Sequence, residues 1–388
     1  MDKEKAAPWL AALSMYSGDN TVNNVDRTAA GTSRSAATAS GVVIGRHGAT
    51  AVITLDRADK LNAINSAMRQ TVADAMHDLA DDPRIYGLVI RAVPARAFSA
   101  GGDILELYAQ ELRSPGTAAR NLADEYALVW AMECFNKPTV SFIDGPAIGS
   151  GVGLTLYGTH RVAGPDYRFQ MPETTIGFFP DDGLAHVFAR MPRQIGVYLG
   201  LTGRALGRAD ALRLGLVTHC IAPEHFAEIQ GRYADADPID PLLDDRHVAP
   251  DPAPIDHYAE VIARCFAADT VEDIIARLAA EPAHKDWCAG VAADLAVRSP
   301  LALKVTLRHI RLAAHLDLRQ TLAIDHRIAC RLLAAPDFSA AVRCRLIEKT
   351  GRPRWQPDRL ADVTETMLDD VFAPMPGHEL VLPTFQEL

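Results

Sequence analysis

Short β-rich runs alternate with a helical pattern along the first two thirds of this chain. The β-rich runs fall at 41–45, 51–55, 87–91, 139–143 and 167–171. Between the second and the third run, apolar Met68, Val72, Met76 and Leu79 recur at the spacing of one helix face. Strands that alternate with helices in this way predict a layered α/β core.

The composition of the chain changes on both sides of this core. Residues 1–38 are rich in Ser, Thr, Ala, Gly and Asn, so we expect a flexible extension with little to bury. Residues 232–255 are rich in Pro and Asp, which is typical of an extended surface linker. The sequence therefore predicts an α/β core over 39–231.

Beyond the linker, residues 256–388 are expected to form a mainly helical lobe. Apolar spacing predicts four helices, at 257–266, 271–280, 300–313 and 318–333. From residue 355 onward the pattern becomes irregular. No solenoid-type repeat is found in the sequence.

Charge and cysteine usage narrow the range of partners and compartments. A net charge of -10 argues against nucleic acid or an anionic membrane as the main partner. No apolar run is long enough for a spanning helix, and the first residues do not resemble a secretory signal. The six cysteines are scattered without a CxxC pair, which favours neither zinc nor disulfides and leads us to predict a cytoplasmic protein without a metal.

Residues 171–183 contain two acids in a segment whose apolar residues predict that it is buried. Glu173 and Asp181 lie among Met, Ile and Phe residues, and burial raises the pKa of a carboxyl group toward the range useful for general-base chemistry. The alternative is an ordinary turn, because Pro-Asp-Asp-Gly suits the start of a helix at 184–191, with Asp182 as its cap.

Two glycine-rich turns follow β-rich runs, at 97–104 and 145–153. Glycine allows close backbone approach, and exposed N–H groups at helix starts can hold a carbonyl oxygen as it becomes negatively charged. Either turn alone is also explained by tight packing. The second turn lacks GxGxxG spacing, which disfavours a dinucleotide-binding site, and no P-loop is present, which disfavours a nucleotide hydrolase. Ser99 lacks a GxSxG context, which disfavours a serine hydrolase. His160, His186 and His219 have no partner at zinc or triad spacing and are interpreted as structural.

Taken together, these segments resemble the crotonase (enoyl-CoA hydratase/isomerase) superfamily. The resemblance runs through 55–65, both glycine turns, 172–173, 201–204 and 209–217. Within the superfamily the chain is most similar to the 3-hydroxyisobutyryl-CoA hydrolases, on segments 171–174, 177–181, 265–274, 337–338 and 351–357. The resemblance implies an α/β spiral of ββα units with a helical C-terminal lobe. Members of the superfamily commonly form trimers or dimers of trimers, so a homo-oligomer is also implied.

The resemblance implies an acyl-CoA ligand, with coenzyme A as part of the substrate and no separate cofactor. The thioester carbonyl would sit between the N–H groups of Gly102 and Ser150, where the family usually has Gly in place of Ser150. The positions that match CoA contacts in the family are Lys60, Leu61, Ala63, Ala100 and Ile104.

The same resemblance implies which acids carry the chemistry. Hydratases of the superfamily have a second Glu where this chain has Gly153, which leaves Glu173 as the principal group and disfavours plain hydration. Hydrolases of the subgroup pair this Glu with the position of Asp181. Glu173 would either attack the carbonyl or activate water, and Asp181 would orient the 3-hydroxyl or the water, or exchange protons with the leaving group.

The expected function is hydrolysis of a short 3-hydroxyacyl-CoA thioester, 3-hydroxyisobutyryl-CoA from valine breakdown being the foremost candidate. One alternative is an enoyl-CoA isomerase or hydratase of the same superfamily. A second alternative is a non-catalytic acyl-CoA-binding protein.

Overall fold

A six-stranded sheet forms the centre of the computed structural model, which describes residues 40–384. Its spatial order is β1-β2-β3-β4-β6-β9. β1 and β2 pair as an antiparallel hairpin, and every later neighbour pairs in parallel. The strands are β1 (Val42–His47), β2 (Thr50–Leu55), β3 (Gly87–Ala92), β4 (Thr139–Ile143), β6 (His160–Ala163) and β9 (His219–Cys220).

A second, three-stranded sheet carries the chain into both segments that the sequence singles out. It consists of β5 (Pro146–Ile148), β7 (Arg168–Gln170) and β8 (Leu206–Gly207). β5 pairs in parallel with β7, so the two strands end at the same edge. β5 lies within the second glycine turn, and after β7 the chain enters 171–183.

Helices follow the strands as the alternation predicts. In α2, Met68, Val72 and Met76 are buried, and Asn65 caps the helix by accepting the N–H of Met68. The helices of this part are α2 (Ser66–Ala80), α3 (Ile104–Arg113), α4 (Thr117–Cys134), α5 (Ser150–Leu156), α6 (Leu184–Arg190), α7 (Ile195–Thr202), α8 (Arg208–Arg213) and α9 (Phe226–Ala234). Short 3-10 helices lie at Ala58–Lys60, Glu173–Ile176, Pro192–Gln194 and Pro223–His225.

The predicted linker differs from its expected form. Instead of an extended segment, residues Ile239–Asp244 form helix α10, and its Ile239, Leu242 and Leu243 pack against the sheet residues Val140 and Val162. Three apolar side chains at helical spacing outweigh the Pro and Asp content here. The domain boundaries at 39–231, 232–255 and 256–388 stay a prediction, and residues 1–38 lie outside the described part of the chain.

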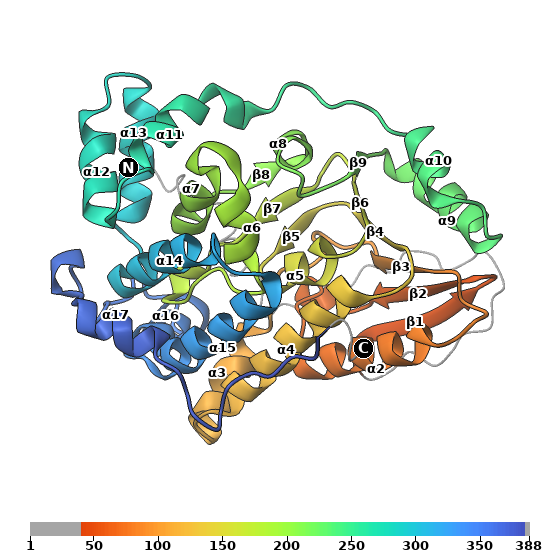
Figure 1. Cartoon of the computed structure of the whole chain (residues 1–388), viewed down its shortest axis with the longest axis horizontal. Coiled ribbons are helices and arrows are strands. Elements are labelled where there is room, and N and C mark those ends of the chain that lie inside the picture. Colours follow the sequence, from red (N-terminus) through yellow and green to blue (C-terminus); the bar gives the residue numbers. More distant parts are fainter. Residues whose placement is uncertain (1–39, 385–388) are drawn as a thin grey trace.

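The C-terminal part is helical and packs on the core of its own chain, α14 against α6 and α7 and α15 against α4 (Figure 1). α15 begins at a capping box formed by Asp317 and Gln320. The helices are α11 (Ala259–Cys265), α12 (Val271–Ala280), α13 (Lys285–Leu295), α14 (Pro300–Ala313), α15 (Leu318–Ala334), α16 (Pro336–Val342), a π-helix (Arg343–Ile347) and α17 (Glu365–Phe372), with 3-10 turns at Pro254–His257 and Leu360–Asp362. α13, α16, the π-helix and α17 were not predicted.

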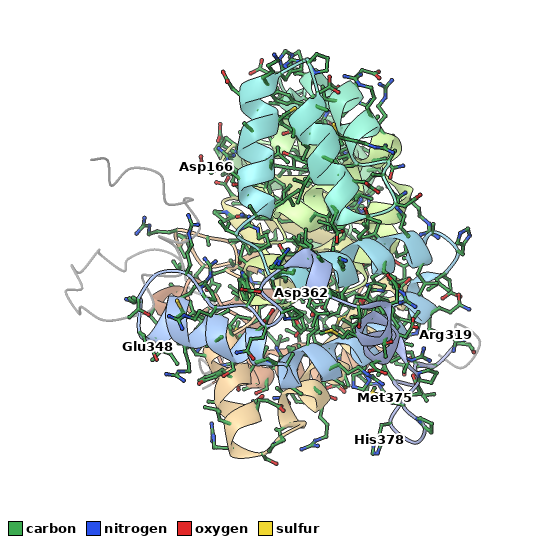
Figure 2. The ribbon with its side chains drawn as sticks, turned by 90° about the vertical axis from the view of Figure 1, so that its left-hand side faces the viewer. Asp166, Arg319, Glu348, Asp362, Met375 and His378 are labelled. Atoms are coloured by element: carbon green, nitrogen blue, oxygen red, sulfur yellow. The ribbon has the colours of Figure 1, made fainter. Side chains whose placement is uncertain are left out.

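Two apolar clusters meet at the segment 171–183. Ile176, Phe178 and Phe179 belong to the cluster formed by α3, α4 and the C-terminal helices, whereas Met171 and Leu184 belong to the cluster under the sheet. The C-terminal chain crosses the side of the molecule seen in Figure 2, where Asp362 lies between Glu348 and Arg319. The C-terminal lobe therefore packs directly against the segment 171–183. No helix of the described residues is long and apolar enough to cross a membrane.

Candidate active site

The two glycine turns lie side by side. Ser99 forms a bridge with Ala147, in which its N–H donates to Pro146 (3.1 Å) and its carbonyl accepts from Ile148 (3.0 Å). Gly101 has a φ of +97°, and a Cβ atom there would stand 3.0 Å from the Ile148 carbonyl oxygen. A side chain at this position would therefore push the two turns apart.

Gly102 and Ser150 are brought next to each other at the starts of α3 and α5. A Cβ on Gly102 would lie 3.0 Å from the Ser150 hydroxyl oxygen. Ser150 is the first residue of α5, and Gly102 directly precedes Asp103, the N-cap of α3. Within residues 40–384, neither of their N–H groups enters a backbone hydrogen bond. Two adjacent N–H donors at helix starts are suited to an oxygen that gains negative charge.

Glu173 faces the same point from the turn that follows β7. A Cβ on Gly149 would lie 3.0 Å from Glu173 Oε1, so the carboxyl group lies directly against the second glycine turn. The residue is only 8% exposed, and Oε2 has no hydrogen-bond partner among the described residues. Burial, followed by the charge of Asp181, raises the pKa of Glu173 well above its usual value.

Asp181 lies on the same cavity and is held by an aromatic residue from α4. Tyr126 donates its phenolic hydrogen to Asp181 Oδ2 at 2.9 Å, and both side chains are buried. Burial and the charge of Glu125 raise the pKa of Asp181 to about 7, while the hydrogen bond from Tyr126 lowers it. Both acids therefore have pKa values above the range of exposed carboxyl groups.

One cavity joins these groups. Its walls come from both glycine turns, from Glu173 and Asp181, and from the C-terminal lobe. The full set is Ala100, Gly101, Gly102, Ile104, Leu107, Leu122, Ile148, Gly149, Ser150, Pro172, Glu173, Thr175, Ile176, Phe178, Asp181, Leu333, Phe338 and Leu346. The four predicted catalytic residues and two of the predicted CoA contacts, Ala100 and Ile104, therefore lie on one surface.

The other predicted CoA contacts lie beside this cavity and do not line it. The carbonyl of Leu61 accepts the N–H of Ala100 at 3.0 Å, which places the 60–63 segment next to the cavity wall. Lys60 is partly exposed, whereas Ala63 is fully buried and its carbonyl accepts a hydrogen bond from Arg57. A CoA contact by the Ala63 side chain would therefore require this segment to move.

Asp182 is not the helix cap that the sequence suggests. α6 is preceded by Gly183, and no side chain caps it. Asp182 has a φ of +55°, and this left-handed conformation accompanies a fully buried carboxyl group. A Cβ on Gly153 would lie 2.6 Å from Asp182 Oδ2, so Asp182 fills the space that a side chain at 153 would take.

Further charged groups lie behind the cavity, and sequence patterns did not indicate them. Arg69 and Glu125 form an ion pair at 3.2 Å with about 95% of each side chain buried (4% and 5% exposed). Asp325 of α15 accepts the N–H of Gly183 at 2.7 Å, and burial lowers the pKa of its neighbour His309 to about 3. These residues are far apart in the sequence, and no motif joins them to Asp181.

The predicted structural histidines lie away from the cavity. His186 contacts the Leu316 carbonyl, and His160 and His219 face Asp240 and Asp244 at 3.2 and 3.3 Å.

The fold and the site together define a class of protein in which two backbone N–H groups and a buried glutamate converge on one cavity. The family model described as enoyl-CoA hydratase/isomerase matches residues 50–372. The chain belongs to this family, and its fold is the crotonase-like α/β fold that the resemblance predicts.

Curated relatives agree with the narrower resemblance. The chain is 32% identical over 350 residues to 3-hydroxyisobutyryl-CoA hydrolase, mitochondrial, of Xenopus tropicalis, covering 86% of this chain and 89% of that protein. It is 34% identical over 347 residues to the mitochondrial 3-hydroxyisobutyryl-CoA hydrolase-like protein 1 of Arabidopsis thaliana, with 86% of each chain covered. The human hydrolase is 32% identical over 352 residues, covering 87% of this chain and 90% of that one.

Two solved structures are similar over most of the chain. A carnitinyl-CoA dehydratase from Mycobacterium thermoresistibile has a TM-score of 0.83 at 32% identity and covers 88% of this chain and 98% of its own. An enoyl-CoA hydratase from Rhodobacter sphaeroides 2.4.1 has the same TM-score and identity and covers 88% of this chain and all (100%) of its own.

The prediction of a cytoplasmic location is wrong by this comparison, because these curated relatives from frog, plant and human are named as mitochondrial proteins. Unpaired cysteines indicate a reducing environment. They do not distinguish one reducing compartment from another, so composition could not supply this answer.

Proposed function

We propose that this chain hydrolyses a short 3-hydroxyacyl-CoA thioester, with 3-hydroxyisobutyryl-CoA, an intermediate of valine catabolism, as its substrate. The products would be 3-hydroxyisobutyrate and free CoA. The names of the curated relatives support this substrate. The observation that carries the proposal is the position of Glu173, whose carboxyl group lies against Gly149 and next to the paired N–H groups of Gly102 and Ser150.

In the proposed reaction the thioester oxygen accepts hydrogen bonds from the N–H groups of Gly102 and Ser150. As the carbonyl carbon is attacked, the charge that moves to this oxygen is stabilised; one such donor is typically worth about 3–4 kcal/mol. Because both donors belong to the backbone, Ser150 can replace the glycine usual in the family without loss of the donor itself.

Glu173 supplies the attacking group in one of two ways. It attacks the carbonyl carbon itself and forms a mixed anhydride that water then opens, or it takes a proton from a water molecule that attacks directly. In both routes the carbon–sulfur bond breaks and the sulfur takes up a proton. The oxygen of one water molecule becomes part of a carboxyl group. Asp181, held by Tyr126, faces the same cavity and would orient the 3-hydroxyl or the water, or pass the proton to the sulfur.

The alternative reaction of the family, hydration or isomerisation of an enoyl-CoA, is supported by the names of the two similar proteins of known structure, a carnitinyl-CoA dehydratase and an enoyl-CoA hydratase. Hydration calls for two positioned acid/base groups. Gly153 has no side chain to serve as the second, and the paired Asp181 and Tyr126 would have no task in a simple isomerase. We therefore place hydrolysis first.

The CoA part of the substrate would leave the cavity past Ala100 and Ile104 toward Lys60 and Leu61. Lys60 would contact a phosphate group. A homo-oligomer remains part of the proposal on the strength of the family resemblance.

One assay separates the candidate functions. The purified protein is incubated with 3-hydroxyisobutyryl-CoA and with 3-enoyl-CoAs, and free thiol and double-bond migration are followed together. Thiol release from the hydroxyacyl substrate is the expected result. Migration of the double bond without thiol release would select an isomerase, and binding without turnover would select an acyl-CoA-binding protein.

A further inference from the structure

A second, smaller void lies directly behind the cavity, and Ser150 lines both. It has room for about one water molecule. Most of its lining is apolar, formed by Leu55, Ile64, Met68, Val72, Leu128, Val129 and Leu154. Besides Ser150, the other lining residues are Arg69, Glu125, Gly153 and Asp182. We call this void the inner chamber.

The polar groups that line the inner chamber are buried, and several of their atoms have no hydrogen-bond partner among the described residues. Both carboxyl oxygens of Asp182 have no hydrogen-bond partner among the described residues, and the same holds for Nε and Nη2 of Arg69. Arg69 and Glu125 lie 3.2 Å apart, but Glu125 Oε2 is not aligned for a hydrogen bond. Leaving one buried polar group unpaired typically costs about 1–3 kcal/mol, so several such groups around one void call for a ligand that donates and accepts.

Gly153 leaves room for the Asp182 carboxyl group at the edge of this void. Any side chain there would collide with the Asp182 carboxyl group, whose Oδ2 would stand 2.6 Å from the added Cβ. Asp182 itself adopts a φ of +55°, a conformation that Asp tolerates better than most residues. The absence of a side chain at Gly153 and the left-handed conformation of Asp182 together allow the Asp182 carboxyl group to line the inner chamber.

We propose that the inner chamber holds the water molecule that the hydrolysis consumes, and that Asp182 is its positioning residue. This inference rests on the proposed hydrolase function. The chamber has room for about one water molecule, which uses two to four polar partners, and Asp182, Glu125 and Arg69 offer them. Burial, followed by the charge of Glu125, raises the pKa of Asp182 well above its usual value, which favours the protonated carboxyl that both donates and accepts.

The position of the chamber next to the main cavity explains why a bound water molecule there would be useful. An acyl group bound between Gly102, Ser150 and Glu173 fills the main cavity and keeps solvent from the reacting carbon. Water held behind Ser150 would reach that carbon from the inner side, without passing the CoA chain. Its oxygen ends in the acid product, one of its protons ends on the sulfur, and the carbon–sulfur bond is the bond that breaks.

The test measures which nucleophile captures the acyl group. Turnover of 3-hydroxyisobutyryl-CoA is run with hydroxylamine present, and the ratio of free acid to hydroxamate is determined. Asp182→Gly removes the carboxyl group and suits the positive φ, and we expect the ratio to fall about 10-fold because water loses its position whereas hydroxylamine enters from the main cavity. Asp182→Asn, which can still donate and accept, should restore most of the ratio.

Asp325→Asn is the matched control. Asp325 is a buried acid of the same neighbourhood, but it does not line the chamber, and we expect an unchanged ratio. An unchanged ratio in Asp182→Gly, or an equal fall in Asp325→Asn, would overturn the inference. A high-resolution crystal structure of the wild-type protein gives a test that does not depend on any variant. An ordered water within hydrogen-bond distance of Asp182 supports the inference and an empty chamber overturns it.

These outcomes can be told apart from failure of the proposed function. If the wild-type protein releases no thiol from any 3-hydroxyacyl-CoA, the hydrolase proposal fails. If it does release thiol and the ratio does not respond to Asp182, only the water site fails.

Discussion

Tyr126 on α4 and Asp181 in the turn before α6 are joined by a hydrogen bond of 2.9 Å, although 55 residues separate them in the sequence. The bond holds one of the two cavity acids in a fixed orientation. Because it favours the ionised carboxyl, it also offsets part of the effect of burial on the pKa of Asp181, which stands at about 7. The pair therefore links the geometry of the site to its pH dependence.

We expect kcat/KM to fall as the pH is lowered through about 7, because Asp181, whose pKa is about 7, loses its charge there. The raised pKa of Glu173, which must be ionised to react, acts in the same direction. In Tyr126→Phe the pKa of Asp181 loses the effect that lowers it, so this acid limb should move to higher pH. Loss of a hydrogen bond to a charged group should also lower kcat/KM about 10-fold. The check is a pair of pH–rate profiles, and an acid limb near pH 4 in the wild-type protein would contradict the account.

The backbone N–H of residue 150, the proposed oxyanion donor, can be removed without breaking a hydrogen bond within α5. Proline is tolerated at the first position of a helix, so Ser150→Pro takes away the N–H group where α5 begins. We expect kcat to fall by about 100- to 1000-fold. Ser150→Ala keeps the N–H and should remain within a few-fold of wild type. Equal losses in the two variants would mean that the side chain, and not the backbone, is what matters.

Buried acids should make the stability of this protein decrease with rising pH. Burial raises the folded-state pKa of Asp325 well above the value of the unfolded chain, so the folded state holds the proton more firmly. The resulting stabilisation is present at low pH and is lost as the pH rises toward the folded-state pKa. The Asp325→Asn side chain cannot titrate. The free energy of unfolding of this variant, relative to that of the wild type, should therefore increase as the pH is raised from about 5 to about 8. Urea unfolding at both pH values checks this, and a constant difference would speak against it.

The contact between Gly153 and Asp182 can be tested by a double-mutant cycle. Gly153→Ala places a methyl group against the Asp182 carboxyl and should lower the free energy of unfolding by about 1–3 kcal/mol. In the background of Asp182→Gly the same substitution should cost clearly less, because the obstructing group is gone. Additive effects in thermal or urea unfolding would show that the two positions do not interact.

The fold and the main acids could be predicted because their signals are local. The β-rich runs gave five of the strands, the spacing of Met68, Val72 and Met76 gave α2, and Glu173 and Asp181 stood out as acids among apolar neighbours. α10 was missed because its Pro and Asp content hid three apolar residues that face the sheet. α13 is only weakly amphipathic, and it too was missed.

The second layer of the site depends on contacts between distant parts of the chain, which a single sequence does not contain. Tyr126, Glu125 and Arg69 come from two helices that look like ordinary buried helices on their own. The role of Asp182 as a cap was predicted from the Pro-Asp-Asp-Gly pattern, and the backbone conformation at Asp182 decided otherwise. Close approaches of this kind follow from tertiary packing and not from local pattern.

The most direct test of the central claim is thiol release from 3-hydroxyisobutyryl-CoA by the wild-type protein and by Glu173→Gln. The amide keeps the shape of the side chain but can neither attack the carbonyl nor take a proton from water. We predict steady thiol release by the wild-type protein and a loss of about 1000-fold or more in the folded variant. Turnover by Glu173→Gln at the wild-type rate would contradict the account.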